Sequence, residues 1–185
     1  MVVDPLNGHW VVDTGPLSHF ARAGWFGILQ LIAPDGVIWI PDTVEREILQ
    51  ARSSNAWLEP IVEFDWVRVL PIQTDAELAA FSRYARLLVG DDGRNIGECG
   101  VLALAEVHGM VSVVDDQAGH KAAVRCGVDN RRTLGLLCDA VEAGHVTLAT
   151  VSIVADALCD SEYRLPFQRG GFERWAIANG RLQSS

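Results

Sequence analysis

The chain alternates between short apolar runs and longer stretches in which apolar residues recur at helical spacing. Short runs rich in β-branched residues are typical of buried parallel strands. Strands separated by helices predict βαβ units and therefore a central parallel sheet. The runs that predict strands are residues 11–12, 37–40, 66–70 and 111–114, with shorter ones at 128 and 146–148.

The amphipathic stretches between these runs predict helices. Asp42 and Glu45 have the spacing of a capping box, which places Asp42 at a helix N-cap. We expect one α/β domain over residues 1–150, with a sheet of four to five strands flanked by helices, and a helical C-terminal extension over 151–185 packed on the same domain. The predicted helices are residues 17–31 with an interruption at Gly24, 42–51, 74–88, 96–107, 116–126, 133–143, 152–159 and 171–178, with a loop at 90–93.

Length and composition agree with a single compact domain. The 185 residues are 49% hydrophobic, enough for a sizeable core. There is no apolar run of about 18 residues and no signal peptide at the N-terminus, so we expect a cytoplasmic protein without a membrane partner. The four cysteines and five histidines are too scattered for a zinc site or a disulfide framework. Large aromatic residues such as Trp175 are expected in the core, with an interface as the alternative.

Charge limits how the protein meets nucleic acid. The formal net charge is −9, which argues against a broad electrostatic grip on a polyanion. Lys121 is nevertheless the only lysine among 15 basic residues, and the other 14 are arginines, whose forked side chains suit phosphate groups. Compositional bias is the alternative explanation. Residues 164–185 hold four arginines and one acid, so this tail differs from the acidic body.

Two predicted strands run directly into an aspartate. Asp13 follows Val12, and Asp115 follows Val114. If the strands are neighbours, both carboxylates reach the same sheet edge, where α/β proteins build their sites. Unpaired carboxylates would repel each other, whereas Mg²⁺ or Mn²⁺ would remove that penalty. Helix capping is the alternative for Asp13, and also for Asp116, the nearest rival to Asp115.

Two glutamates are candidates to join these aspartates. On the helix after Pro41, Glu47 lies nearer than Glu45 to the buried face. Its alternative role is that of a solvated surface residue. Glu98 opens an apolar helix between Gly97 and Gly100, small residues that permit a close approach. A first-turn glutamate is otherwise a partner of the helix dipole.

Together, these junctions resemble the PIN-domain family, and in particular the PIN-like (VapC-like) toxins of type II toxin–antitoxin pairs. The resemblance covers residues 10–145. In the fourth of its motifs, Val113 to Ala123, Gln117 and His120 stand where members of the family commonly carry basic residues. This weakens the expectation of phosphate contacts from that helix. The motifs are Val11 to Leu17, Pro41 to Leu49, Ile96 to Ala105, Val113 to Ala123 and Thr133 to Leu137.

The resemblance implies a metal-dependent ribonuclease that acts on an RNA substrate. Asp13, Glu47, Glu98 and Asp115 would hold one or two Mg²⁺ or Mn²⁺ ions, with Asp116 as the rival to Asp115. Thr14 would orient a metal-bound water, or simply serve as a small turn residue. A cognate antitoxin with a basic segment and a homodimer are the implied partners.

Two other functions compete with this interpretation. A non-catalytic PIN-like module would act through protein or RNA contacts. An Asp-based phosphatase also places an aspartate after its first strand, but Gly15 stands where such an enzyme would carry its second aspartate.

Overall fold

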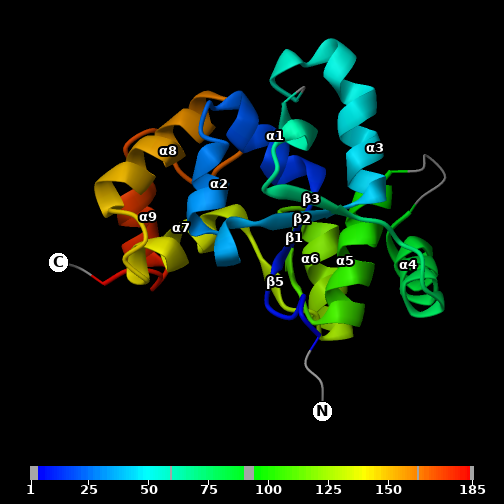
Figure 1. Cartoon of the computed structure of the whole chain (residues 1–185). Coiled ribbons are helices and arrows are strands. Elements are labelled where there is room, and N and C mark those ends of the chain that lie inside the picture. The colour runs from blue at the N-terminus through cyan, green and yellow to red at the C-terminus, as the bar shows by residue number, and fades with distance from the viewer. Residues whose placement is uncertain (1–3, 59, 90–93, 162, 184–185) are drawn as a thin grey trace.

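The computed structural model describes residues 4–58, 60–89, 94–161 and 163–183. Its centre is a parallel sheet of five strands in the order β3-β2-β1-β4-β5 (Figure 1). The single α/β domain and the parallel sheet predicted from the apolar runs are therefore confirmed. The strands are β1 (Trp10–Val12), β2 (Ile38–Pro41), β3 (Val67–Leu70), β4 (Val111–Val113) and β5 (Asn130–Arg131).

Strand β1 lies where the order in which strands are added to the sheet reverses. From β1 the chain proceeds to β2 and β3 on one side, and then crosses back to β4 and β5 on the other. Val12 is in register with Val113, and the Asp13 amide donates to the Val113 carbonyl at 3.1 Å. In α/β proteins, ligands bind beyond the carboxyl ends of the strands at such a switch point, and this edge of the sheet is called the crevice below. Asp13 and Asp115 follow the two strands that border it.

The central helix is α5, which contacts β1, β2 and β4 and packs most extensively on α4. Every residue from Gly97 to Ala105 is buried, as expected of a helix that is apolar on all sides. None of the described helices has the length and apolar character needed to cross a membrane. The helices are α1 (Thr14–Arg22), α2 (Gly27–Ile32), α3 (Asp42–Ala51), α4 (Asp75–Leu88), α5 (Ile96–His108), α6 (Gln117–Cys126), α7 (Thr133–Glu142), α8 (Leu148–Asp160) and α9 (Phe172–Ala178), with short 3-10 turns at Pro34–Gly36, Arg52–Ser54, Ala56–Leu58 and Ile61–Glu63.

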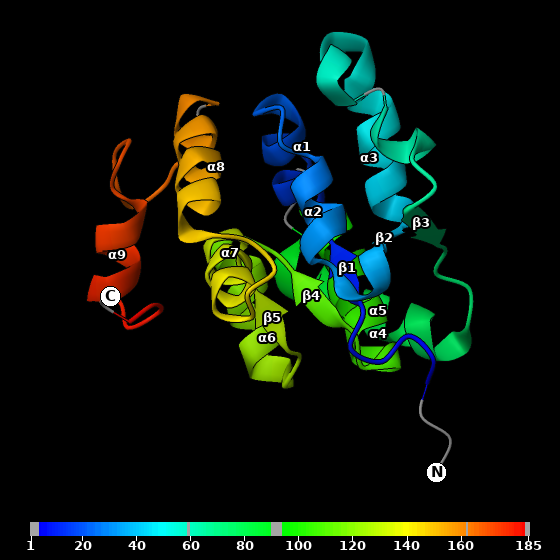
Figure 2. The ribbon, with the colours of Figure 1, turned by 60° about the vertical axis from the view of Figure 1, so that its left-hand side comes forward.

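The last two helices stand at one end of the molecule. Figures 1 and 2 both place α8 and α9 on the side opposite α4. Helix α8 packs on α7 and α9. The division between domain and extension at residue 150 stays a prediction, and it falls within the first turn of α8.

Three local predictions were wrong. Val128 does not begin a strand, because β5 starts at Asn130. Residues 146–148 form no strand, because Thr147 caps α8 by accepting from the Thr150 amide at 3.1 Å and Leu148 begins that helix. Asp42 is not an N-cap either. Pro41 holds that position with an extended backbone, and Asp42 lies inside the first turn, where it pairs with Arg46 at 2.8 Å. The loop predicted at 90–93 lies outside the described residues.

Candidate metal centre

Asp13 leaves β1 at the crevice and begins helix α1. Its Oδ2 accepts from the Gly15 amide at 3.3 Å, so the capping alternative is correct for this residue. Burial, together with the negative charges of Glu47 and, more weakly, Asp115, raises the pKa of Asp13 to about 7. The capping hydrogen bond involves only the Oδ2 atom, so it does not prevent Asp13 from lying near other acids.

Glu47 reaches the same crevice from α3, held by two donors. The Thr14 hydroxyl donates to its Oε2 at 2.5 Å, and the Gly97 amide at the start of α5 donates to its Oε1 at 2.9 Å. A Cβ on Gly97 would lie 2.7 Å from Oε2, so this close contact requires glycine. Glu47 is therefore not a solvated surface residue, and Thr14 orients it.

Glu98 lies in the first turn of α5 and is 7% exposed. Its Oε2 is buried and accepts no hydrogen bond from any described residue. Burial, together with the charges of Asp13, Asp116 and Glu47, raises the pKa of Glu98 to about 8. A buried carboxylate oxygen without a donor is costly, unless a cation or a proton compensates for it.

Asp115 lies just beyond β4, where Thr133 of α7 holds both of its oxygens. The Thr133 amide donates to Oδ1 at 2.8 Å and the Thr133 hydroxyl donates to Oδ2 at 2.7 Å. Asp116, by contrast, caps α6 by accepting from the Ala118 amide at 2.6 Å. The charge of Asp115 acts on Asp13, whereas that of Asp116 acts on Glu98.

The crevice therefore gathers Asp13, Glu47 and Glu98, with Asp115 beside Asp13 and Asp116 beside Glu98. Among the described residues, however, no group of three or more His, Cys, Asp and Glu side chains has the arrangement needed to hold a metal ion. The neighbouring negative charges contribute to the raised pKa of Asp13 and of Glu98, but the acids do not form a complete coordination shell. Their oxygen chemistry and the unpartnered Glu98 oxygen fit a hard divalent cation such as Mg²⁺ or Mn²⁺.

Sequence reasoning missed two residues that shape this centre. Thr133 lies 18 positions after Asp115 and holds it in place. Gly119 of α6 leaves room for Glu98, because a Cβ there would lie 2.7 Å from Oε2 and 2.6 Å from the Val114 side chain. A threonine at the start of a helix and a glycine inside another were visible in the sequence, but their partners were not.

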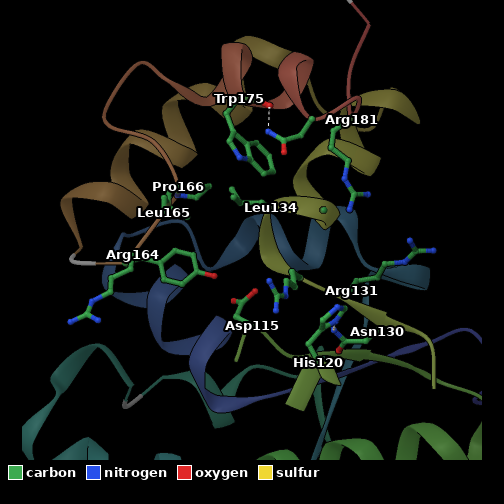
Figure 3. Close-up of a pocket in the computed structure, with 14 residues that line it drawn as sticks. Asp115, His120, Asn130, Arg131, Leu134, Arg164, Leu165, Pro166, Trp175 and Arg181 are labelled. Atoms are coloured by element: carbon green, nitrogen blue, oxygen red, sulfur yellow. Dashed lines mark hydrogen bonds between the residues drawn. The ribbon is translucent and has the colours of Figure 1, made fainter. Parts of the chain in front are cut away.

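Asp115 also borders a cavity of about 640 Å³ on the side of α7 and α9 (Figure 3). Tyr163 lines this cavity and packs on His19 of α1, with 4.1 Å between the ring centroids. Burial, followed by the charge of Asp115, raises the pKa of the Tyr163 hydroxyl. Tyr163 thus connects the acidic crevice to the cavity.

A family model described as "PIN domain" matches residues 9–169. The match includes all five strands and every acid of the crevice. No curated protein matches the chain.

Proposed function

The chain belongs to the PIN-domain family, whose members are generally nucleases, and from this premise we propose that it is a metal-dependent ribonuclease. Asp13, Glu47 and Glu98 would hold Mg²⁺ or Mn²⁺ together with Asp115, or with Asp116 in its place. The bound metal would supply an activated water for attack on an RNA phosphodiester and would stabilise the charge that develops there.

One observation carries this proposal: the buried Oε2 of Glu98 has no donor, although Glu98 lies beside the charges of Asp13 and Glu47. A protein built only for stability would be expected to give that oxygen a hydrogen bond or replace it with an apolar group. A divalent cation would supply the missing positive charge. The family membership indicates the kind of chemistry that the cation serves.

The remaining residues orient the acids. Thr14 and the Gly97 amide hold the two oxygens of Glu47, and Thr133 holds those of Asp115. Such partners behind metal-binding side chains fix their rotamers before a metal arrives. In the absence of a cation, the raised pKa of Glu98 means that this group holds a proton near neutral pH.

RNA cleavage tests the proposal. The protein would be incubated with structured RNA in Mg²⁺ or in Mn²⁺, with EDTA and Asp13→Asn as negative controls. Glu45→Gln serves as a matched control, because Glu45 is on α3 but outside the crevice contacts of Glu47. We expect cleavage by the wild type and by the Glu45 variant only. Cleavage that persists in EDTA or in Asp13→Asn contradicts the mechanism.

A second candidate is a non-catalytic PIN-like module that binds RNA or protein. The observation in its favour is that no three candidate ligands among the described residues have the arrangement of a metal site. This candidate predicts RNA binding without cleavage and no heat of metal binding in calorimetry.

We also propose, from the resemblance to PIN-like toxins, that the protein is a cytoplasmic toxin of a type II pair. The net charge of −9 and the acidic crevice would suit a basic segment of a cognate antitoxin. A small adjacent reading frame for a DNA-binding protein that suppresses toxicity on co-expression would support this role. Homodimer formation is part of the same proposal, and a monomer at all concentrations in sedimentation contradicts it.

A further inference from the structure

The cavity beside Asp115 is built by segments distant in sequence. Figure 3 shows Asp115 and Trp175 on opposite sides of it, with Arg164 on one flank and Arg131 and Arg181 on the other. These residues come from the end of β4, from α9, from the segment after α8, from β5 and from the chain after α9. Its volume of about 640 Å³ lies within the range of small-molecule sites.

The lining of this cavity is strongly basic. Among the described residues that line it are Arg131, Arg132, Arg164 and Arg181, and Asp115 is the one acidic residue of that lining. Elsewhere the chain is acidic, so positive charge is concentrated at this place. The arginine-rich tail seen in the sequence thus contributes Arg164 and Arg181 to a defined cavity.

Several of these guanidinium groups are available to a ligand. The side chains of Arg164 and Arg181 are exposed and form no hydrogen bond or ion pair with another described residue. The Arg132 side chain donates to Gln117, but its buried Nε has no partner in the part of the chain that the structure describes. Unpaired arginines around a cavity favour a ligand with phosphate or carboxylate groups.

Trp175 adds an aromatic surface to this charge. It was expected in the core, yet it is only partly buried and lines the cavity. Phe167 and Phe172 support its ring, with centroids 5.6 and 6.3 Å away. A held aromatic ring among arginines suits a nucleobase joined to phosphates, because bases stack on aromatic faces while arginines bind the backbone.

We propose that this cavity binds one nucleotide of a single-stranded segment of RNA, next to the phosphodiester presented to the acids. The arginines contact its phosphates and Trp175 stacks on its base. This inference rests on the proposed ribonuclease function and names the substrate contacts of that site. It also explains how a protein with a net charge of −9 holds a polyanion: the contact is local and lies directly beside Asp115.

Binding in EDTA tests the cavity without requiring cleavage. Fluorescence anisotropy would measure the dissociation constant of a labelled single-stranded RNA decamer for the wild type, for the double variant Arg164→Gln/Arg181→Gln and for Trp175→Leu. Arg174→Gln is the matched control, because Arg174 is exposed on α9 but does not line this cavity. Circular dichroism and thermal melting would establish that each variant is folded.

We expect the double variant to bind roughly tenfold more weakly and to lose about 1.4 from its log–log salt slope, since each phosphate contact on single strands contributes about 0.7. Trp175→Leu should weaken binding at least about fivefold, as for a lost stacking contact. The Arg174 variant should match the wild type.

Equal affinity of the wild type and the double variant, or no RNA binding by the wild type, overturns the proposal. A polyglutamate peptide that binds the wild type more tightly than RNA does also overturns it. RNA binding that depends on Arg164 and Arg181 but is never followed by cleavage in Mg²⁺ or Mn²⁺ supports the cavity and contradicts the ribonuclease function. The two proposals therefore fail separately.

Discussion

Glu47 on α3 accepts a hydrogen bond at 2.9 Å from the amide of Gly97, 50 residues away at the start of α5. The contact joins one candidate ligand to the helix that carries another, Glu98. Because a Cβ on Gly97 would lie within 2.9 Å of three Glu47 atoms, any side chain there must displace the carboxylate.

Gly97→Ala is therefore expected to reduce RNA cleavage by about 10²-fold, the scale of a small misplacement in an active site. On helix propensity alone, alanine would stabilise α5 by ~1 kcal/mol. Gly27→Ala is the control, since nothing lies within 4 Å of a Cβ at that position. Cleavage rates and thermal melts of both variants check this, and full activity of Gly97→Ala would exclude a role for the Glu47 position.

Thr133 is expected to act by holding Asp115. Thr133→Val removes the hydroxyl that donates to Oδ2 and keeps the amide that donates to Oδ1. Loss of such a supporting contact typically lowers metal affinity or activity about 10- to 100-fold. Thr133→Ser retains the hydroxyl and should restore most of the activity. A serine variant as impaired as the valine variant would assign Thr133 to packing instead.

The acids of the crevice should destabilise the protein as pH rises in EDTA. The pKa of Asp13 is raised to about 7 and that of Glu98 to about 8, above unfolded values of about 4. Between about pH 4 and pH 8 the folded state therefore binds more protons than the unfolded state, and the free energy of unfolding falls as pH increases.

Asp13→Asn should remove part of this loss of stability, because asparagine does not ionise. The variant should keep helix α1 intact, because asparagine also caps helices. We expect the variant to be more stable than the wild type by about 2 kcal/mol at pH 8 in EDTA, and equal to it near pH 4. Mg²⁺ should raise the melting temperature of the wild type more than that of the variant. Thermal melts across pH check this, and a variant less stable than the wild type at pH 8 contradicts it.

His108 links the N-terminal segment to α4. Its Nδ1 lies 2.8 Å from Asp4 Oδ2 and its Nε2 lies 2.8 Å from Glu77 Oε1. Burial lowers the pKa of His108, but the hydrogen bonds to Asp4 and Glu77 outweigh burial and raise it overall. The pKa of Asp4 is lowered chiefly by its hydrogen bond with His108. Burial raises the pKa of Glu77, but the Thr74 and Gln73 amides and His108 outweigh it and lower the pKa overall.

The contribution of His108 to the free energy of unfolding is full below about pH 6.5 and is lost as pH rises through the pKa of the folded state. The contributions of Asp4 and Glu77 are lost below about pH 4. His108→Gln should therefore cost about 2 kcal/mol at pH 5.5 and less at pH 9. Urea unfolding at both pH values measures this, with exposed His145→Gln as the control. An equal cost at both pH values would show that packing, and not charge, explains it.

Strands β1 to β4 were predictable because they coincide with short apolar runs rich in β-branched residues, each followed by an aspartate or a proline. Strand β5 (Asn130–Arg131) was not, because neither of its residues is apolar. The orientation of Glu47 followed from helical periodicity, and the approach of Asp13 to Asp115 from the way parallel strands end together. The contact between Thr133 and Asp115 was not predictable, because it needs the order β1-β4-β5 and the position of α7. Asp42 failed as an N-cap because Pro41 already ends β2 with an extended backbone.

Mn²⁺ titration by calorimetry tests the central claim most directly, because it needs no knowledge of the RNA. The wild type should bind Mn²⁺, Glu98→Gln should bind it at least about tenfold more weakly, as for a lost ligand, and Glu45→Gln should match the wild type. Equal binding by the wild type and Glu98→Gln, or no binding by the wild type, would contradict a metal centre at this crevice.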